Sequence, residues 1–281
     1  MDRPRGVGMT AVFVAAARAL ETGRDDRLLD DPWAREFVRA SGWDPPTETM
    51  DDFSREMLTA WVAARTKFLD DFALDAVDRG CRQVVLLGAG LDTRAFRLAW
   101  RSPVTVYELD TPDMIGFKAE VLGDAEPASA DRVVLPIDLR DDWPAALRHA
   151  GFHPDVPTAW ILEGLLMYLP DEAVDTLMTR LGELSAPGSA VGATITNADA
   201  AAALNDSPLF RDSPISRDEW LAMLRSNGPS DPVAWFGSYG WRAEAVPIDD
   251  VAETYGRAVQ GGPGTWRARP GQRWLIAARR K

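Results

Sequence analysis

Cysteine and histidine are almost missing from this chain, which has one Cys and two His among its 281 residues. The single Cys81 excludes an internal disulfide and is typical of proteins from a reducing compartment. Because Cys81 precedes a strand, we expect a buried and unreactive thiol. His149 and His153 have no neighbouring cysteine and no paired spacing, so they form no metal-binding motif. We therefore expect no metal centre, and no Ser-His-Asp or Cys-His nucleophile.

Positive charge is also scarce, since 43 acidic residues against 31 basic ones give a formal net charge of −12. This balance argues against binding to nucleic acid or to an anionic membrane, both of which need clustered Lys and Arg. The apolar run Met9–Ala17 ends at Arg18, too short for a membrane span, and no clear cleavage pattern follows. We predict a loose tail over Met1–Gly8, an amphipathic helix over Thr10–Thr22, and a cytoplasmic protein.

What the sequence does contain is a buried strand that runs into a glycine-rich turn, Gln83–Gly90 (QVVLLGAG). Gly88 and Gly90 allow a tight turn and let a ligand approach main-chain atoms. The following residues, LDTRAFRLAW, have helix-like spacing, and a second apolar run then ends at Asp110, about twenty residues after the turn. A carboxylate at the tip of the neighbouring strand is where a nucleotide ribose is bound. The segment therefore predicts a βαβ nucleoside-binding unit.

The residues after the turn indicate which nucleoside is bound. A dinucleotide fingerprint requires G-x-G-x-x-G, but the third glycine position holds Thr93, and Asp92 lies where a pyrophosphate would meet the helix start. A fixed negative charge opposes phosphate binding there, although Asp92 is equally a good helix N-cap. S-adenosylmethionine has a ribose and a sulfonium cation but no phosphate, so an acidic loop suits it. The pattern favours that cofactor and demotes NAD without excluding it.

Further strands are expected at 132–137, 158–162, 189–195, 240–246 and 273–277, and helices are expected to start at 30–32 and to span 53–79, 171–184 and 220–224. Asp138 follows one of these strands and either faces the ligand crevice or caps the next helix. Glu163 lies at the tip of another. Arg65 belongs to a solvated helix face or, alternatively, points towards the glycine turn and receives a ligand carboxylate.

These elements predict a doubly wound α/β fold with a mostly parallel sheet. We expect one domain over residues 1–281. It consists of a helical cover (1–80), a cofactor-binding core (81–195), a lid that shapes the acceptor pocket (196–235) and a terminal strand pair (236–281).

Several blocks in this order resemble the leucine carboxyl methyltransferase family, in particular its bacterial branch: ARTKFLDD, LLGAGLDTRAFRL, YELDTP, IDLRDDW, AWILEGLLMYLP and GSYGWRAE. The resemblance covers nearly the whole chain. It implies the S-adenosylmethionine-dependent methyltransferase fold, a Rossmann-like arrangement with a seven-stranded sheet whose last strand is antiparallel.

The resemblance also implies roles at positions that the spacing has already singled out. Arg65 would bind the carboxylate of the cofactor's methionine part, which Gly88 and Gly90 would let pass close to the loop. Asp110 would accept the ribose hydroxyls.

The remaining implied roles concern the adenine and the amino group of the cofactor. Asp138 would lie near the adenine amino group and Leu139 against the face of the ring. Glu163 would face the cofactor's amino group.

The acceptor is a small molecule or a peptide, and the shortage of histidine bears on its chemistry. A carboxylate is already nucleophilic at neutral pH, whereas a phenol or an alcohol benefits from a general base. A carboxylate is therefore favoured, with Tyr168 as a residue that could orient it. Tyr168 could equally be a packed aromatic side chain.

The eleven tryptophans supply a second set of expectations. Trp33, Trp61 and Trp160 fall on apolar faces and are expected in the core. Trp235, Phe236 and Trp241 could line an aromatic acceptor pocket.

Three functional hypotheses follow from the sequence. The leading one is an S-adenosylmethionine-dependent O-methyltransferase that acts on a carboxylate. The alternatives are a protein that binds the cofactor without turnover, and an NAD(P)-dependent reductase that rests only on the βαβ pattern.

Overall fold

The computed structural model describes residues 3–44, 52–197, 214–257 and 273–280. Its centre is one seven-stranded sheet of order β3-β2-β1-β4-β5-β7-β6, in which β7 runs antiparallel to both of its neighbours. The strands are β1 (Gln83–Leu87), β2 (Thr105–Asp110), β3 (Asp131–Pro136), β4 (Thr158–Leu162), β5 (Ala190–Thr196), β6 (Trp241–Pro247) and β7 (Arg273–Arg280). The prediction of a seven-stranded, mostly parallel sheet with an antiparallel strand is therefore confirmed.

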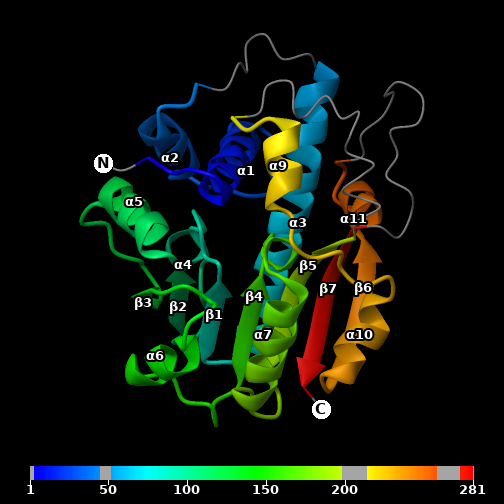
Figure 1. Cartoon of the computed structure of the whole chain (residues 1–281). Coiled ribbons are helices and arrows are strands. Elements are labelled where there is room, and N and C mark those ends of the chain that lie inside the picture. Colours follow the sequence, from blue (N-terminus) through cyan, green and yellow to red (C-terminus); the bar gives the residue numbers. More distant parts are fainter. Residues whose placement is uncertain (1–2, 45–51, 198–213, 258–272, 281) are drawn as a thin grey trace.

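Helices cover both faces of this sheet and one of its edges (Figure 1). They are α1 (Val7–Thr22), α2 (Ala34–Ser41), α3 (Asp52–Asp78), α4 (Arg94–Arg97), α5 (Pro112–Leu122), α6 (Trp143–His149), the 3₁₀ turn η1 (Leu166–Tyr168), α7 (Asp171–Glu183), α9 (Arg217–Met223), α10 (Pro232–Ser238) and α11 (Ile248–Thr254). Figure 1 shows α1, α2 and α9 above the edge at which the parallel strands end.

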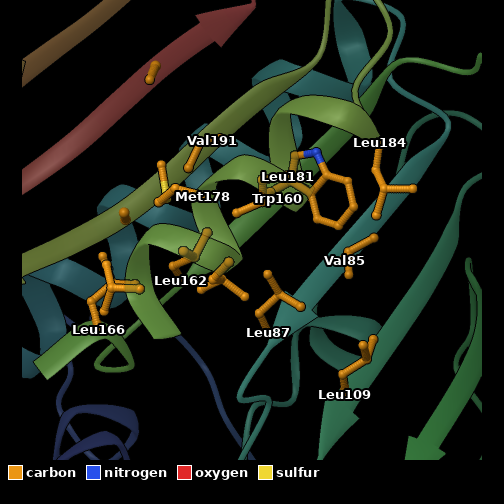
Figure 2. Close-up of a cluster of buried hydrophobic side chains, with 14 of the residues drawn as sticks. Val85, Leu87, Leu109, Trp160, Leu162, Leu166, Met178, Leu181, Leu184 and Val191 are labelled. Atoms are coloured by element: carbon orange, nitrogen blue, oxygen red, sulfur yellow. The ribbon is translucent and has the colours of Figure 1, made fainter. Parts of the chain in front are cut away.

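One face of the sheet packs against α6, α7 and α10 through a large apolar cluster, part of which is drawn in Figure 2. Trp160 of β4 is fully buried at its centre, and its indole N–H donates to Ser185 Oγ at 2.8 Å. All five residues of β1 and of β4 are buried, as expected for central strands covered on both faces. The edge strand β6 instead alternates between buried or partly buried and exposed residues. The apolar runs in the sequence are therefore the strands at the centre of the sheet.

The opposite face packs against α3, and Gly192 of β5 is a point of close contact between the two. A Cβ atom at Gly192 would come within 2.6 Å of a ring carbon of Phe72 and within 2.9 Å of a methyl of Leu69. A larger residue would therefore push α3 away from β5. The absence of a side chain at Gly192 therefore determines how closely α3 packs on β5.

At the N-terminus the structure differs from the sequence-based expectation. The helix begins at Val7, so the segment predicted as a loose tail is partly helical. Helix α2 begins at Ala34, a turn after the predicted start. The predicted cap, Asp31, instead accepts a hydrogen bond on its carboxylate from Nε of buried Arg18 at 2.7 Å. This ion pair ties the start of α2 to α1.

Two further segments correct the predicted elements. The helix expected after the glycine turn is reduced to Arg94–Arg97, because Leu98 is already extended and Pro103 follows. The terminal segment contains α10 and α11 in addition to β6 and β7, and β7 continues to Arg280. In the part of the chain that the structure describes, no helix combines the length and the apolar character needed to cross a membrane.

Candidate functional site

A cavity of about 980 Å³ lies at the edge of the sheet where the parallel strands end. Its wall includes residues from the ends of β1, β2, β4 and β5, from the start of β7, and from α1 and α3. In open α/β sheets this edge is where ligands bind. Because the strands lie side by side in the order β2-β1-β4-β5-β7, the cavity extends across most of the sheet.

The glycine turn after β1 forms part of the floor of this cavity. Gly88 has φ +66° and Gly90 has φ +46°, a backbone region that residues with a side chain rarely adopt. A Cβ at Gly88 would lie 2.9 Å from Leu165 Cδ1, and one at Gly90 would lie 3.5 Å from Ala11 Cβ. Gly88 therefore lets Leu165 approach closely, whereas Gly90 is required by its φ alone, since 3.5 Å is an ordinary contact; both glycines line the cavity.

Asp110, at the end of β2, also lines the cavity and is held by main-chain donors. Its Oδ2 accepts a hydrogen bond from the Gly90 amide at 2.7 Å, and its Oδ1 accepts one from the Thr111 amide at 2.7 Å. Burial raises the pKa of Asp110, and the two amides oppose this shift. The carboxylate is thus fixed in place, beside the glycine turn, with unused lone pairs.

Glu163, directly after β4, forms an ion pair with two arginines. Arg65 Nε donates to its Oε1 at 2.8 Å, and Arg94 Nη1 lies 2.8 Å from its Oε2. Burial would raise the pKa of Glu163, but Arg94, Arg65 and Arg18 outweigh it and lower the pKa to about 2. The structure therefore brings together Arg65 and Glu163, which lie 98 positions apart in the sequence.

Beneath Glu163 lies a charge network that the sequence analysis did not identify. Arg94 is 1% exposed and also bonds Asp70 through Nε at 2.8 Å and Asp92 through Nη1. Arg97 Nη2 donates to Asp70 at 2.7 Å. Burial lowers the pKa of Arg94, but Asp92, Glu163 and Asp70 raise it well above its usual value. The charge of Asp92 is therefore already paired, so it opposes a phosphate less than the sequence alone suggests.

Asp138 and Leu139 follow β3 and both line the cavity. Asp138 Oδ1 accepts from Arg140 Nε at 2.9 Å, and its Oδ2 lies 2.6 Å from Arg140 Nη2. The hydrogen bond from Arg140 lowers the pKa of Asp138. The helix α6 is capped by Asp142, whose Oδ1 accepts from the Ala145 amide, so Asp138 does not serve as that cap.

Tyr168 is the last residue of η1, which contacts β5, whereas Asp138 follows the edge strand β3. The Tyr168 hydroxyl accepts a hydrogen bond from the indole N–H of Trp220 at 3.2 Å, which connects η1 to α9. Both residues line the cavity. The amide of Arg225 bonds the Met167 carbonyl at 2.8 Å, which holds the segment after α9 against η1.

The aromatic residues around the cavity differ from those expected. Phe236 and Trp241 are 0% and 1% exposed and belong to the apolar cluster on the α7 face of the sheet, where Trp235 packs against them. That expectation is wrong, because α10 directs Trp235 and Phe236, and β6 directs Trp241, to the core. Trp160 is buried as expected, and Trp33 is partly buried against the α1–α2 cluster. Trp61, expected in the core, instead lines the cavity together with Trp220 and Trp274.

The two histidines lie away from the cavity. His149 ends α6 and contacts the Ala145 carbonyl at 2.8 Å, and the main chain of His153 bonds Gln83 at the start of β1. Among the described residues, no group of three or more His, Cys, Asp or Glu side chains could hold a metal ion. Cys81 is buried, and burial raises the pKa of its thiol to about 11.

Comparison with known proteins places this geometry in a family. A family model described as leucine carboxyl methyltransferase matches residues 11–182. A protein from Frankia alni is 43% identical over 263 residues, which cover 91% of this chain and 90% of that protein. One from Streptomyces coelicolor is 41% identical over 279 residues, with coverage of 93% and 94%. The names of both relatives assign them to the S-adenosyl-L-methionine-dependent methyltransferases.

Solved structures show the same fold at much lower identity. A DUF574 family protein from Streptomyces avermitilis superposes with a TM-score of 0.58 at 18% identity, over 97% of both chains. A Thermobifida fusca protein superposes with a TM-score of 0.50 at 17% identity, over 94% of both chains.

The family decides between the hypotheses that the sequence left open. Its members use S-adenosylmethionine, so the reductase alternative is set aside, and the resemblance of the sequence blocks is confirmed. The chain belongs to the leucine carboxyl methyltransferase family and is a methyltransferase that depends on S-adenosylmethionine.

Proposed function

We propose that this enzyme transfers the methyl group of S-adenosylmethionine to a carboxylate of a small molecule or peptide. The observation that carries the proposal is the charge of the cavity beyond the cofactor-binding strands. We call the part formed by η1, by α9 with the residues after it up to Arg225, and by the start of β7 the acceptor half. Among the described residues, its charged side chains are Arg225 and Arg273. Cations in this position favour an anionic acceptor over a neutral one.

The cofactor would lie over β1, β2 and β3, and the residues present fit it. Gly88 and Gly90 line this part of the cavity with main chain that carries no side chain. Asp110, held by two amides, offers unused acceptor positions for the ribose hydroxyls. Asp138 and Leu139 border the same part of the cavity at the end of β3, where we place the adenine.

The amino acid end of the cofactor would lie at Arg65 and Glu163. A zwitterion has a carboxylate and an ammonium group, and this pair offers the opposite charge to each. Only Nε of Arg65 is engaged by Glu163, so its terminal nitrogens are available to a carboxylate. Before the cofactor binds, the charges of Arg65 and Glu163 neutralise each other, so both side chains can be partly buried.

The chemistry is an in-line displacement that needs positioning more than acid–base groups. When bound, S-adenosylmethionine would supply a methyl group on a sulfonium, and passing that group to a carboxylate oxygen would leave the bonding electron pair on sulfur as a neutral thioether. No proton is transferred, so a carboxylate acceptor requires no general base. Holding the two reactants in near-attack geometry can lower the barrier by roughly 7–11 kcal/mol. Tyr168, fixed by Trp220, would orient the acceptor through its hydroxyl.

The chain organisation belongs to the same proposal. We assign residues 1–80 to a helical cover, 81–195 to cofactor binding, 196–235 to a lid over the acceptor and 236–281 to the terminal strand pair, all in one domain. The described part of the lid contributes Ile215 and Trp220 to the cavity wall, although residues 198–213 lie outside the described part of the chain. A reducing, cytoplasmic location fits the single buried Cys81.

A product-based assay tests the carboxylate. The enzyme is incubated with methyl-labelled S-adenosylmethionine and a panel of aromatic acids, aliphatic acids and peptides with a free C-terminus. The matched primary amide of each acid serves as the neutral control. We expect label that mild alkali releases as methanol, because methyl esters hydrolyse and methyl ethers or amines do not. Label that survives alkali, or transfer to amides as fast as to acids, would contradict the proposal.

A further inference from the structure

Arg273 is one of the two charged side chains of the acceptor half, neither of which has a role in binding the cofactor. It is the first residue of β7 and pairs in register with Thr196, the last residue of β5. Because β7 is antiparallel, its first residue lies at the edge where β5 ends. The cofactor residues follow β1, β2, β3 and β4, so Arg273 lies beyond them across the sheet.

The guanidinium of Arg273 is stacked on an aromatic ring, and two of its nitrogens make no hydrogen bond to the part of the chain that the structure describes. Its side chain is 10% exposed, and its central carbon lies 3.5 Å from the centre of the Trp61 ring. The indole N–H of Trp61 donates to Asp249 Oδ1 at 2.9 Å, which holds the ring in place. Asp249 Oδ1 is 3.6 Å from Arg273 Nη2, an ion pair without a hydrogen bond. Nε and Nη2 of Arg273 are buried and have no hydrogen-bond partner among the described residues.

Two buried donors of this arginine lack the hydrogen bonds that would offset their loss of hydration. A buried donor without a partner loses its hydration and gains nothing in return, and the penalty is larger for a charged group. Burial lowers the pKa of Arg273 to about 10, and Asp249 restores only part of the shift. The guanidinium nevertheless remains a cation at neutral pH. Its environment therefore favours an anion that would complete it.

The two atoms without partners define which anion fits. Nε and Nη2 are adjacent donors on one edge of the planar guanidinium, and such an edge can bind both oxygens of a carboxylate in parallel. Both atoms are covered in this structure and Nη2 faces Asp249, so a carboxylate that enters the cavity reaches them when the Arg273 side chain turns away from Asp249. The wall next to Arg273 is mainly apolar and includes Ile248, Trp274 and Leu275. This combination suits a carboxylate attached to an apolar or aromatic group.

We infer that Arg273, stacked on Trp61, is the anchor for the acceptor's carboxylate. The inference rests on the proposed function and adds a specificity-determining residue and a substrate class to it: carboxylic acids with an apolar body. Methyl transfer converts the anion into a neutral ester and so removes its ion pair with Arg273. The anchor therefore distinguishes substrate from product by charge.

Binding measurements without turnover test the anchor. The protein is first saturated with S-adenosylhomocysteine and then titrated calorimetrically with benzoate, indole-3-acetate and hexanoate, each paired with its primary amide. We expect at least one acid to bind about 10-fold or more tightly than its amide. Arg273→Met should abolish this preference, and Arg273→Lys should leave only part of it, because a lysine provides charge without the paired donors.

A matched control lies on the same strand. Arg279→Met removes an arginine that bonds Asp75 at 2.9 Å and does not line the cavity, and it should leave the acid preference intact. Binding of S-adenosylhomocysteine reports whether each variant is folded. If Arg273→Met fails to fold, the Lys variant decides.

Two outcomes would overturn the anchor: no acid preferred over its amide by the unmodified protein, or a preference that survives in Arg273→Met or is undiminished in Arg273→Lys. The proposed function fails separately. An acid preference that depends on Arg273, together with alkali-stable product, would reject ester formation and keep the anchor. Ester formation that is unaffected by Arg273→Met would reject the anchor and keep the function.

Discussion

Glu163 lies between two arginines, so its ionisation is linked to the stability of the fold. Its pKa is lowered from 4.5 to about 2 in the folded protein. An acid whose pKa is depressed on folding stabilises the folded state above its unfolded pKa. That contribution is lost as the pH falls from 4.5 to about 2. The size of the shift corresponds to about 3 kcal/mol at neutral pH.

Glu163→Gln should therefore lower the free energy of unfolding by up to about 3 kcal/mol at pH 7. The difference from the unmodified protein should shrink as the pH falls through the same window, since both side chains are then neutral. Urea unfolding at pH 7, 5, 4 and 3 measures it.

Glu126→Gln is the matched control, because Glu126 is exposed after α5. It should change the unfolding free energy by less than about 0.5 kcal/mol at every pH. A deficit of Glu163→Gln that stays constant from pH 7 to pH 3 would show that the charge of Glu163 is not its source.

Among single residues, the sequence predicts those that follow a strand and misses those that pair across elements. Asp110, Asp138 and Glu163 were identifiable because each directly follows an apolar run, and such positions share one edge of a parallel sheet. Asp70 and Arg94 carry no comparable pattern. On its helix Asp70 reads as a partner for Lys67, yet Lys67 pairs with Asp71 and Asp70 turns to Arg94.

At the scale of elements, the glycine turn sets how closely η1 can approach β1. Gly88→Ala adds a Cβ at φ +66°, 2.9 Å from Leu165. Leu165 can move its methyl group, but the backbone strain stays. We expect a loss of about 1–2 kcal/mol in unfolding free energy, and weaker binding of S-adenosylhomocysteine as η1 is displaced. Chemical denaturation and calorimetry measure the two effects.

Gly116→Ala makes the same chemical change inside α5, where nothing lies within 4 Å of the new Cβ. There it should stabilise the protein by about 0.5–1 kcal/mol. Equal effects of the two substitutions would mean that the turn imposes no special conformation.

Elements with a clear hydrophobic period were predicted well, and some short ones were not. The central strands were found because apolar runs of four to six residues fit only a strand covered on both faces. The length of the helix after the glycine turn was overestimated. LDTRAFRLAW has helical spacing, but the chain is extended from Leu98 and Pro103 follows. Helices α10 and α11, of seven residues each, were not predicted, whereas a helix was expected at α9, which has the same length and begins with a capping box at Ser216.

For the whole molecule, one ion pair connects regions near the two ends of the chain. Arg257, after α11, donates from Nη2 to Glu21 Oε1 at 2.7 Å and to the Asp26 carbonyl at 2.6 Å. Glu21 belongs to α1 and is 0% exposed. No sequence pattern could pair residues 236 positions apart, so this contact is known only from the fold.

Arg257→Met should destabilise the protein by up to about 3–5 kcal/mol, because it leaves buried Glu21 with Arg24, 3.8 Å away, as its remaining cation. Adding Glu21→Gln to this variant should recover part of the loss. Arg79→Met, which breaks an exposed pair with Asp75, is the control and should change stability by less than about 1 kcal/mol. Additive effects at positions 257 and 21 in denaturant unfolding would disprove the coupling.

Helix α3, pressed onto the sheet at Gly192, supplies both Trp61 and Arg65 to the cavity. Four residues of helix correspond to about one turn and a rise of about 6 Å. On the proposed roles, Arg65 meets the methyl donor and Trp61 supports the group that holds the recipient. The helix then sets the distance between the two reactants through its regular rise per residue, which movement of a loop does not change. Inserting one residue between them would rotate one contact by about 100° relative to the other and separate the pair that the reaction must bring together.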